Sequence, residues 1–270
     1  MSARPPSCRA TIAAASTRYL LSLHAHNRAR YIKARARLYA YDRAVTVNPD
    51  SGDALEAIVF DMDGVLVDSE EIWDEARRNL ALERGLAWPA SAQRDMMGMS
   101  SPEWSRYMHE RVGLTEAPEE ISAEVVSRLE DLYWQHLPLL DGAVQAVESM
   151  AKRFRLGLAS SSNRPIIELV LELAAIADFF EVTVSSEEVE HGKPAPDVYL
   201  EALRKMDVEP NRAAAVEDST NGLLSASAAG MLVIAVPNHA FPPQSEALAH
   251  AVVSIDSLAE LTPELILSYV

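Results

Sequence analysis

Short apolar runs alternate with helical patterns from about residue 57 to the C-terminus. The first run, residues 57–60, is short, contains β-branched residues and is flanked by polar ones, so it predicts a fully buried strand. Further short runs predict strands at residues 156–159, 182–184, 213–216, 231–236 and 252–254.

Residues 69–138 show no strand pattern. Ile72, Ala76 and Leu80 form an apolar stripe along a helix predicted at residues 70–85. Apolar residues at three-to-four spacing predict further helices at residues 102–112 and 118–136. The pattern therefore predicts an all-helical insert of about 70 residues, which is long enough for a small cap domain.

Beyond the insert, predicted helices at residues 143–152, 165–174, 196–206 and 221–229 alternate with the strands. This alternation is typical of right-handed βαβ units and predicts an α/β fold with a doubly wound parallel sheet. We expect a core domain from residues 54–68 and 139–270, a helical cap domain from residues 69–138, and a basic N-terminal extension, residues 1–53, that is disordered or partly helical.

The charge of the chain is unevenly distributed. Residues 1–50 hold nine basic and two acidic residues, a net of +7, and the remainder holds 15 basic and 38 acidic residues, a net of −23. The total of −16 speaks against nucleic acid as a partner of the whole chain. The basic head has three open interpretations: an organelle transit peptide, a disordered basic arm, or translated sequence upstream of the true start.

A single cysteine, Cys8, excludes an internal disulfide and fits a reducing compartment. We therefore expect a cytoplasmic protein, with a transit peptide as the alternative. No apolar run approaches the roughly 18 residues that suggest a membrane span. We expect a monomer.

Two acidic residues, Asp61 and Asp63, follow the first predicted strand, and Gly64 permits the chain to turn away sharply. In an open parallel sheet, ligands bind at the carboxyl ends of the strands. Neighbouring carboxylates repel each other unless a cation or a shared proton lies between them, and Mg²⁺ is a suitable cation. The pattern alone also fits an Asx-rich turn. A calcium loop is excluded because Val65 and Val67 fall where such a loop needs oxygen ligands.

Three later segments also carry polar residues near predicted strand ends. Ser160 leads into a helix N-terminus, where a hydroxyl and backbone N–H groups form an anion site. Lys193 lies between Gly192 and two prolines, which restrict the backbone beneath its charge. Glu217 and Asp218 end another strand with two carboxylates. Each feature alone also fits a common structural role: a helix cap, a solvated lysine, or a turn.

In this order and spacing, the four motifs resemble those of the haloacid dehalogenase-like superfamily of aspartate-nucleophile phosphotransferases. The resemblance covers about residue 57 to the C-terminus. It is closest to the group with a helical cap between the first two motifs, which includes β-phosphoglucomutase-like enzymes and sugar-phosphate phosphatases. It implies a Rossmann-like core with the cap inserted after the first strand.

The resemblance implies a role for each polar strand end. Asp61 matches the nucleophile that becomes an aspartyl phosphate, and Asp63 matches the general acid/base. Lys193 matches the lysine that neutralises the nucleophile and the phosphate. The implied phosphate-binding residues are Ser160, Ser161 and Asn163, and the implied Mg²⁺ ligands are Asp61, Asp63 through its backbone carbonyl, Asp218 and Glu217.

Substrate selection is expected to depend on the cap. Glu70 and Trp73 are candidate substrate-binding residues, although packing of Trp73 within the cap is an equally open interpretation. Other cap residues expected to face the core are Met96, Gly98, Met99 and Trp104.

Within the superfamily, Asp63 favours phosphate esters over halo-acids, because the dehalogenase branch needs no acid there. The mutases carry a histidine where this chain has Trp73, and a cap arginine where it has Ser100 or Ser101. Both departures favour a hydrolase. The resemblance therefore implies a magnesium-dependent phosphatase acting on a small phosphorylated metabolite, a sugar or sugar-alcohol phosphate. A phosphohexomutase and a non-catalytic, cap-mediated binding protein are the alternatives.

Overall fold

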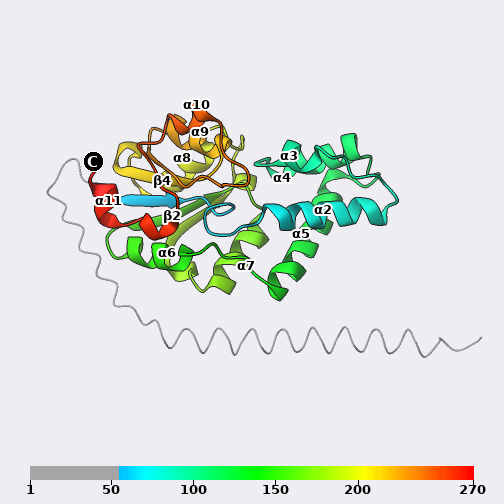
Figure 1. Ribbon diagram of the computed structural model, residues 1–270, viewed down its shortest axis with the longest axis horizontal. Coiled ribbons are helices and arrows are strands. Elements are labelled where there is room, and N and C mark those ends of the chain that lie inside the picture. Colours follow the sequence, from blue (N-terminus) through cyan, green and yellow to red (C-terminus); the bar gives the residue numbers. More distant parts are fainter. Residues whose placement is uncertain (1–54) are drawn as a thin grey trace, which may run out of the picture. The chain divides into compact units, whose positions relative to one another are not determined.

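A six-stranded parallel sheet forms the centre of the chain in the computed structural model, which describes residues 55–270 (Figure 1). The predicted N-terminal extension, residues 1–53, lies outside the described residues. The strand order is β3-β2-β1-β4-β5-β6, so the chain winds outward from β1 in both directions. This confirms the predicted doubly wound sheet. The strands are β1 (Ala57–Phe60), β2 (Arg155–Ser160), β3 (Phe180–Ser185), β4 (Ala213–Glu217), β5 (Leu232–Ala235) and β6 (Val253–Ser254).

Strand β1 lies in the middle of the sheet and is fully buried, because helices cover both faces. Its side chains alternate between the two layers of the core. Ile58 and Phe60 pack into the layer on one face, and Ala57 and Val59 pack into the layer on the other. A continuous apolar run, rather than an alternating one, is therefore what this position requires.

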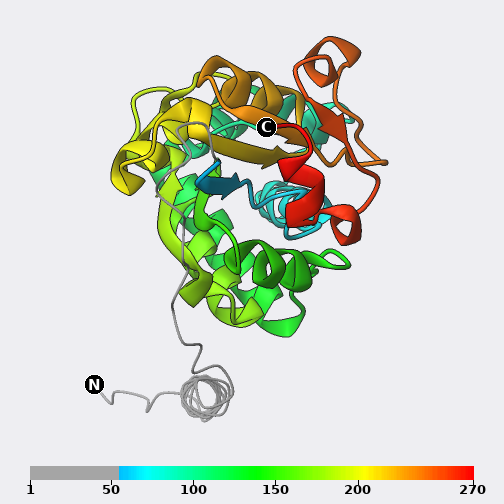
Figure 2. The ribbon, with the colours of Figure 1, turned by 90° about the vertical axis from the view of Figure 1, so that its left-hand side faces the viewer.

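Helices on the two faces of the sheet complete these layers, and Figure 2 shows them on either side of the strands. One layer includes side chains of α6 (Ala143–Ala151), α7 (Arg164–Ala174) and α11 (Pro263–Leu267). The other includes α8 (Asp197–Met206), α9 (Thr220–Ala228) and α10 (Ser245–Leu248).

Between β1 and β2 the chain forms a helical insert, residues 69–138, which contains no strand. Its packed interior includes the buried side chains of Trp104, Leu129 and Tyr133. Figure 1 shows the insert beyond the carboxyl end of β1. Its elements are α2 (Glu70–Glu83), α3 (Ala92–Met96), α4 (Ser101–Tyr107), the π-helix η1 (Met108–Val112) and α5 (Pro118–Gln135).

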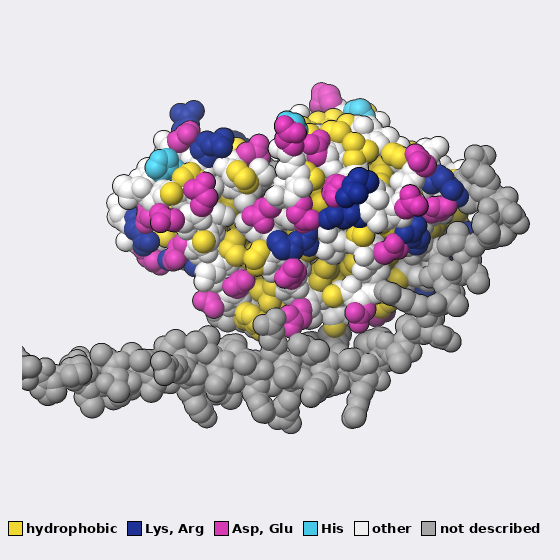
Figure 3. Space-filling view, turned by 180° about the vertical axis from the view of Figure 1, so that it is seen from behind, with side chains coloured by type: hydrophobic (Ala, Val, Ile, Leu, Met, Phe, Trp, Pro, Cys, Tyr) yellow, Lys and Arg dark blue, Asp and Glu magenta, His cyan; other side chains and the backbone are white. Residues whose placement is uncertain are grey.

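Acidic and basic side chains are interspersed on the face shown in Figure 3. On the surface of the insert, Arg128 pairs with Glu83 at 2.7 Å and with Glu124 at 2.8 Å. Exposed pairs of this kind add little stability. Within the described residues, no helix combines the length and apolar character that crossing a bilayer requires.

We expect Leu129→Ala to destabilise the insert strongly. The Leu129 side chain is fully buried in α5, so its truncation leaves a cavity and should lower the free energy of unfolding by about 2–5 kcal/mol. Leu82→Ala is the matched control, because Leu82 is a helical leucine that is 53% exposed. It should change the free energy by less than about 0.5 kcal/mol in the same denaturant titration. Equal losses in the two variants would contradict the assigned packing.

Candidate active site

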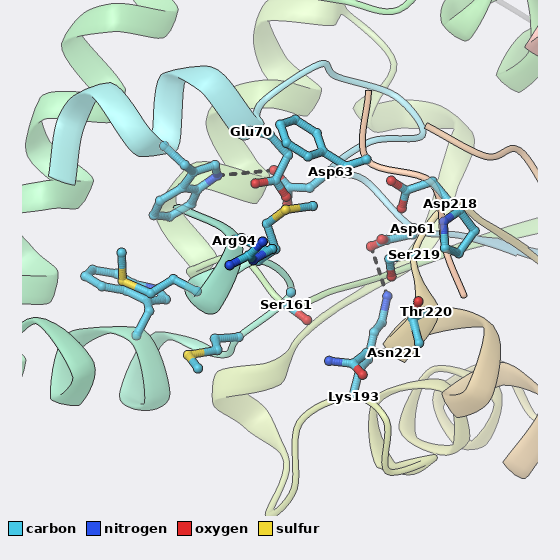
Figure 4. Close-up of a pocket in the computed structure, with 18 of the residues that line it drawn as sticks. Asp61, Asp63, Glu70, Arg94, Ser161, Lys193, Asp218, Ser219, Thr220 and Asn221 are labelled. Atoms are coloured by element: carbon cyan, nitrogen blue, oxygen red, sulfur yellow. Dashed lines mark hydrogen bonds and ion pairs between the residues drawn. The ribbon is translucent and has the colours of Figure 1, made fainter. Parts of the chain in front are cut away.

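The predicted polar strand ends meet at one edge of the sheet. Asp61 follows β1, Ser160 ends β2, and Glu217 and Asp218 lie at the end of β4. Because β1 pairs with both β2 and β4, their carboxyl ends lie side by side. This edge is also where the winding direction reverses, the usual ligand-binding position of such sheets. Figure 4 shows the Lys193 side chain pointing toward Asp61, with Asp218 beyond it.

The Lys193 ammonium group is the centre of the buried charge network. Its Nζ lies 3.0 Å from Asp61 Oδ1 and 2.6 Å from Glu217 Oε1. It also donates a 3.1 Å hydrogen bond to the backbone carbonyl of Ala159, at the end of β2. The side chain is 3% exposed. Burial alone would lower the pKa of Lys193, but the two carboxylates outweigh it and raise the pKa, so the group is a cation at neutral pH.

Glu217 is fully buried and holds this network together. Its Oε1 also accepts a 2.7 Å hydrogen bond from the Tyr199 hydroxyl, and its Oε2 accepts one of 3.1 Å from the Asp218 backbone N–H. Gly222 in the first turn of α9 makes room for the carboxylate, because a Cβ atom there would collide with it. Both oxygens are therefore fixed by donors of the protein.

Three carboxylates near one ammonium group leave an excess of negative charge. Ligand atoms of Asp61, Glu217 and Asp218 all lie within 4.8 Å of one another, and all three residues are buried. Asp218 Oδ1 has no hydrogen-bond partner among the described residues. A side chain at Gly64, where φ is +78°, would collide with the Asp218 carboxylate. The cluster can hold a divalent metal ion, since hard cations prefer carboxylate oxygens.

Burial and repulsion determine the protonation of the carboxylates when no cation is bound. Burial, together with repulsion from Glu217 and Asp63, raises the pKa of Asp61 to about 8, although the Lys193 charge opposes the shift. Burial, Glu217 and Asp61 likewise raise the pKa of Asp218 well above its usual value. A bound cation would stabilise the ionised forms and lower both values.

The Asp63 carboxylate points away from Lys193, toward the helical insert (Figure 4). Its Oδ1 accepts hydrogen bonds from Ser69 Oγ at 2.6 Å and from the indole N–H of Trp73 at 3.3 Å. Its Oδ2 accepts from Ser162 Oγ at 2.7 Å and from Ser160 Oγ at 3.3 Å. Both the core and the insert therefore fix this predicted acid/base.

The three predicted phosphate-binding residues lie in different surroundings. Ser160 is fully buried, and its hydroxyl contacts Asp63 and the backbone N–H of Ser162. Ser161 lines a cavity between the insert and this edge of the sheet. The Asn163 amide donates to Ser122 in the insert and to Glu187 in the core, outside the pocket lining. The structure thus brings Ser161, rather than Ser160 or Asn163, to the pocket surface, and the phosphate-binding roles stay predictions.

A cavity of about 550 Å³ opens between the insert and the core edge. Asp61, Asp63, Lys193 and Asp218 lie in its wall, and Figure 4 shows Glu70 beside Asp63. Burial raises the pKa of Glu70 to about 7, although the Arg77 charge opposes this shift. The residues expected to face the core from the cap all line this cavity: Glu70, Trp73, Met96, Gly98, Met99 and Trp104.

Several residues of the site do not stand out in the sequence. Ser69 and Ser162 both donate to Asp63. Ser69 stands alone among acidic residues, and nothing in the run of serines at 160–162 indicates which hydroxyl faces Asp63. Tyr199 lies six residues after Lys193, on a helix whose buried face brings it to Glu217. Arg77 in α2 and Arg94 in α3 also line the cavity. For Arg77 the available signal was its position one helical turn after Trp73, on the buried face of α2.

With this fold and site, the chain is a member of the haloacid dehalogenase-like hydrolases, whose family profile matches residues 55–230. Hexitol phosphatase B of Escherichia coli is 32% identical over 212 residues, which cover 76% of this chain and 94% of that protein. A probable pseudouridine-5'-phosphatase of Drosophila melanogaster is 32% identical over 213 residues, 76% of this chain and 91% of that protein. The chain is thus an enzyme of the hydrolase class with phosphatase relatives.

Solved structures show the same fold. The crystal structure of CbbY from Rhodobacter sphaeroides in complex with phosphate superimposes with a TM-score of 0.70 at 29% sequence identity. The match covers 77% of this chain and 96% of that one. The likeness therefore includes both the sheet and the helical insert of the described residues.

We expect Asp61→Asn to stabilise the metal-free protein, increasingly so as the pH rises. The folded protein holds the Asp61 proton more tightly than the unfolded chain does, because its pKa rises from 3.8 to about 8. The free energy of unfolding of the wild type should therefore fall between these two values, whereas asparagine cannot ionise. The difference should grow across this range and level off above it.

Denaturant titrations with a chelator at several pH values measure this difference. Asp141→Asn is the control, because Asp141 is an exposed acid on the loop before α6. It should follow the wild type throughout. A constant difference between Asp61→Asn and the wild type would contradict the raised pKa.

Proposed function

We propose that the protein is a magnesium-dependent phosphatase that hydrolyses a small phosphorylated metabolite, a sugar or sugar-alcohol phosphate, through an aspartyl-phosphate intermediate. The main support is the position of Asp61. Its carboxylate lies in the wall of the cavity, 3.0 Å from the Lys193 ammonium group and within the carboxylate cluster that includes Asp218.

In this proposal the Asp61 carboxylate attacks phosphorus, and the bond between phosphorus and the ester oxygen breaks. Asp63 gives its proton to the departing alcohol oxygen. It then takes a proton from the water that attacks the phosphorylated Asp61, which releases inorganic phosphate and restores both carboxyl groups. Lys193 offsets the negative charge on Asp61 and on the transferred phosphoryl oxygens.

The carboxylates of Asp61 and Asp218 and the backbone carbonyl of Asp63 would hold Mg²⁺, with Glu217 within reach. The orphaned, buried Asp218 Oδ1 and the all-oxygen donor set fit this ion. Bound there, Mg²⁺ would supply charge stabilisation to the phosphoryl oxygens.

The alcohol part of the substrate would lie against the insert. Neither Glu70 nor Arg94 has a hydrogen-bond or ion-pair partner among the described residues, and both line the cavity. Glu70 can accept hydrogen bonds from hydroxyl groups, and Arg94 can donate to hydroxyl or anionic groups. The names of the hexitol and pseudouridine phosphatases support a phosphorylated polyhydroxy compound as the substrate class.

A screen of phosphorylated metabolites for phosphate release tests the proposed function. The wild type should release phosphate from one or more sugar or sugar-alcohol phosphates, and Asp61→Asn should reduce kcat by at least about 10⁴-fold, because asparagine is not a nucleophile. Asp141→Asn should keep full activity. Unchanged turnover by Asp61→Asn would exclude this residue as the nucleophile.

Metal removal should abolish turnover, and Mg²⁺ should restore it. Isothermal titration should show Mg²⁺ binding to the wild type and binding at least about tenfold weaker to Asp218→Asn, because one charged ligand is lost. Full activity in excess chelator would rule out the metal requirement.

The same preparation separates hydrolysis from phosphohexose isomerisation. With β-glucose 1-phosphate and glucose 1,6-bisphosphate, a phosphatase releases inorganic phosphate, whereas a mutase yields the isomer without net release. Trp73 at the position of the mutase histidine leads us to expect release.

A further inference from the structure

Arg77 lies in the pocket wall, between two indole rings. It follows Trp73 by one turn of α2, and its guanidinium carbon lies 4.7 Å from the Trp73 ring centroid and 4.8 Å from that of Trp104. The two rings contact each other edge to face, with centroids 5.8 Å apart and an angle of 62° between their planes. Arg77 is 6% exposed, so its cation is fixed by the two aromatic faces rather than by water.

The charge of this arginine has no close carboxylate partner. Among the described residues, no carboxylate lies within ion-pair distance of Arg77, and its buried Nε has no acceptor. Two neighbouring arginines of the insert are paired instead: Arg78 with Asp74 at 3.0 Å and Arg84 with Glu116 at 2.6 Å. Burial lowers the pKa of Arg77 to about 10, although Glu70 and Asp63 oppose the shift, so it is still charged at neutral pH.

An unpaired buried cation is costly, and a packing role alone would be met by an apolar side chain of similar length. What the guanidinium adds is attraction to the faces of the two rings, which fixes the plane of Trp73. That plane matters because the indole N–H of Trp73 donates to Asp63 Oδ1 at 3.3 Å. A continuous series of contacts therefore leads from Trp104 through Arg77 and Trp73 to Asp63.

We propose that Arg77 is a positioning residue for proton transfer: it orients the Trp73 indole, which in turn fixes the Asp63 carboxylate. This inference rests on the proposed function, in which Asp63 protonates the leaving alcohol. Among the described residues, no hydrogen bond or ion pair joins Arg77 directly to Asp61 or Asp63, so it acts through Trp73. Its loss should therefore reduce turnover without weakening substrate binding to the same degree.

A double-mutant cycle tests this inference. Arg77→Met keeps the length and removes the cation, and Trp73→Phe keeps a ring and removes the N–H donor. Each should lower kcat by about tenfold or more, with KM changed less than about threefold. In the Trp73→Phe background, Arg77→Met should cost less than about a further threefold, because the contact through which it acts is already lost. Arg78→Met is the matched control and should retain wild-type kinetics.

The leaving group provides a second, independent comparison. p-Nitrophenolate departs without needing a proton, whereas a sugar alkoxide needs one. The kcat loss in Arg77→Met should therefore be at least about threefold smaller with p-nitrophenyl phosphate than with the best sugar phosphate. Equal kcat losses with both esters, independent effects of the two substitutions, or a raised KM at unchanged kcat would overturn the positioning role.

A measurement that needs no turnover guards against misfolding and separates the two proposals. Hydrogen exchange of the Trp73 indole N–H can be followed by NMR, with each variant measured at the same interval below its own melting temperature. The exchange rate should be at least about tenfold higher in Arg77→Met than in Arg78→Met. Arg77→Lys provides a folded variant if the methionine variant unfolds, and should show an intermediate rate. If the wild type releases phosphate from no ester, the proposed function fails; unchanged exchange in folded Arg77 variants overturns the positioning role.

Discussion

The ion pairs of Lys193 are the interactions on which the rest of the site depends. Placing Asp61, Glu217 and Asp218 together out of water would be prohibitively costly without a cation. Lys193 contacts two of the three carboxylates, and backbone N–H groups at the start of α9 and the Tyr199 hydroxyl satisfy Glu217 further. The remaining negative charge is what makes this edge of the sheet able to hold a divalent ion.

This concentration of charge is possible because the topology brings distant segments together. β1 pairs with β2 on one side and with β4 on the other, so residues about 100 and 150 positions apart end at the same edge. Two glycines then remove the steric barriers: Gly64 beside the Asp218 carboxylate and Gly222 beside Glu217. Any side chain at either position would displace a carboxylate of the network.

The fold was largely predictable from the sequence, because long periodic segments and buried apolar runs determine it. The strand at residues 57–60 and the helix at residues 118–136 were predicted within one residue of β1 and α5. Shorter elements were missed: α3 (Ala92–Met96) spans little more than one turn, too few residues for a periodic pattern to emerge.

The site was predictable where side chains follow strand ends, and not where packing decides their direction. Asp61, Lys193 and Asp218 lie together in the pocket wall. Among the consecutive serines, however, Ser160 is turned inward and Ser161 outward, a difference of backbone path that composition does not encode. For Arg77 the sequence offers only its spacing of four residues from Trp73, and the packing between Trp73 and Trp104 that buries it follows from the fold.

The Asp63 carboxylate accepts hydrogen bonds from both the helical insert and the core. Its Oδ1 accepts from Ser69 and Trp73 of the insert, and its Oδ2 accepts from Ser160 and Ser162 of the core. Any movement of the insert relative to the sheet must therefore change the donors on Asp63 as well as the shape of the cavity. Because the insert also presents Glu70 to that cavity, substrate contact and proton transfer would share one structural element in the proposed function. In that proposal, selection of the alcohol and its protonation are thus linked through the packing of α2.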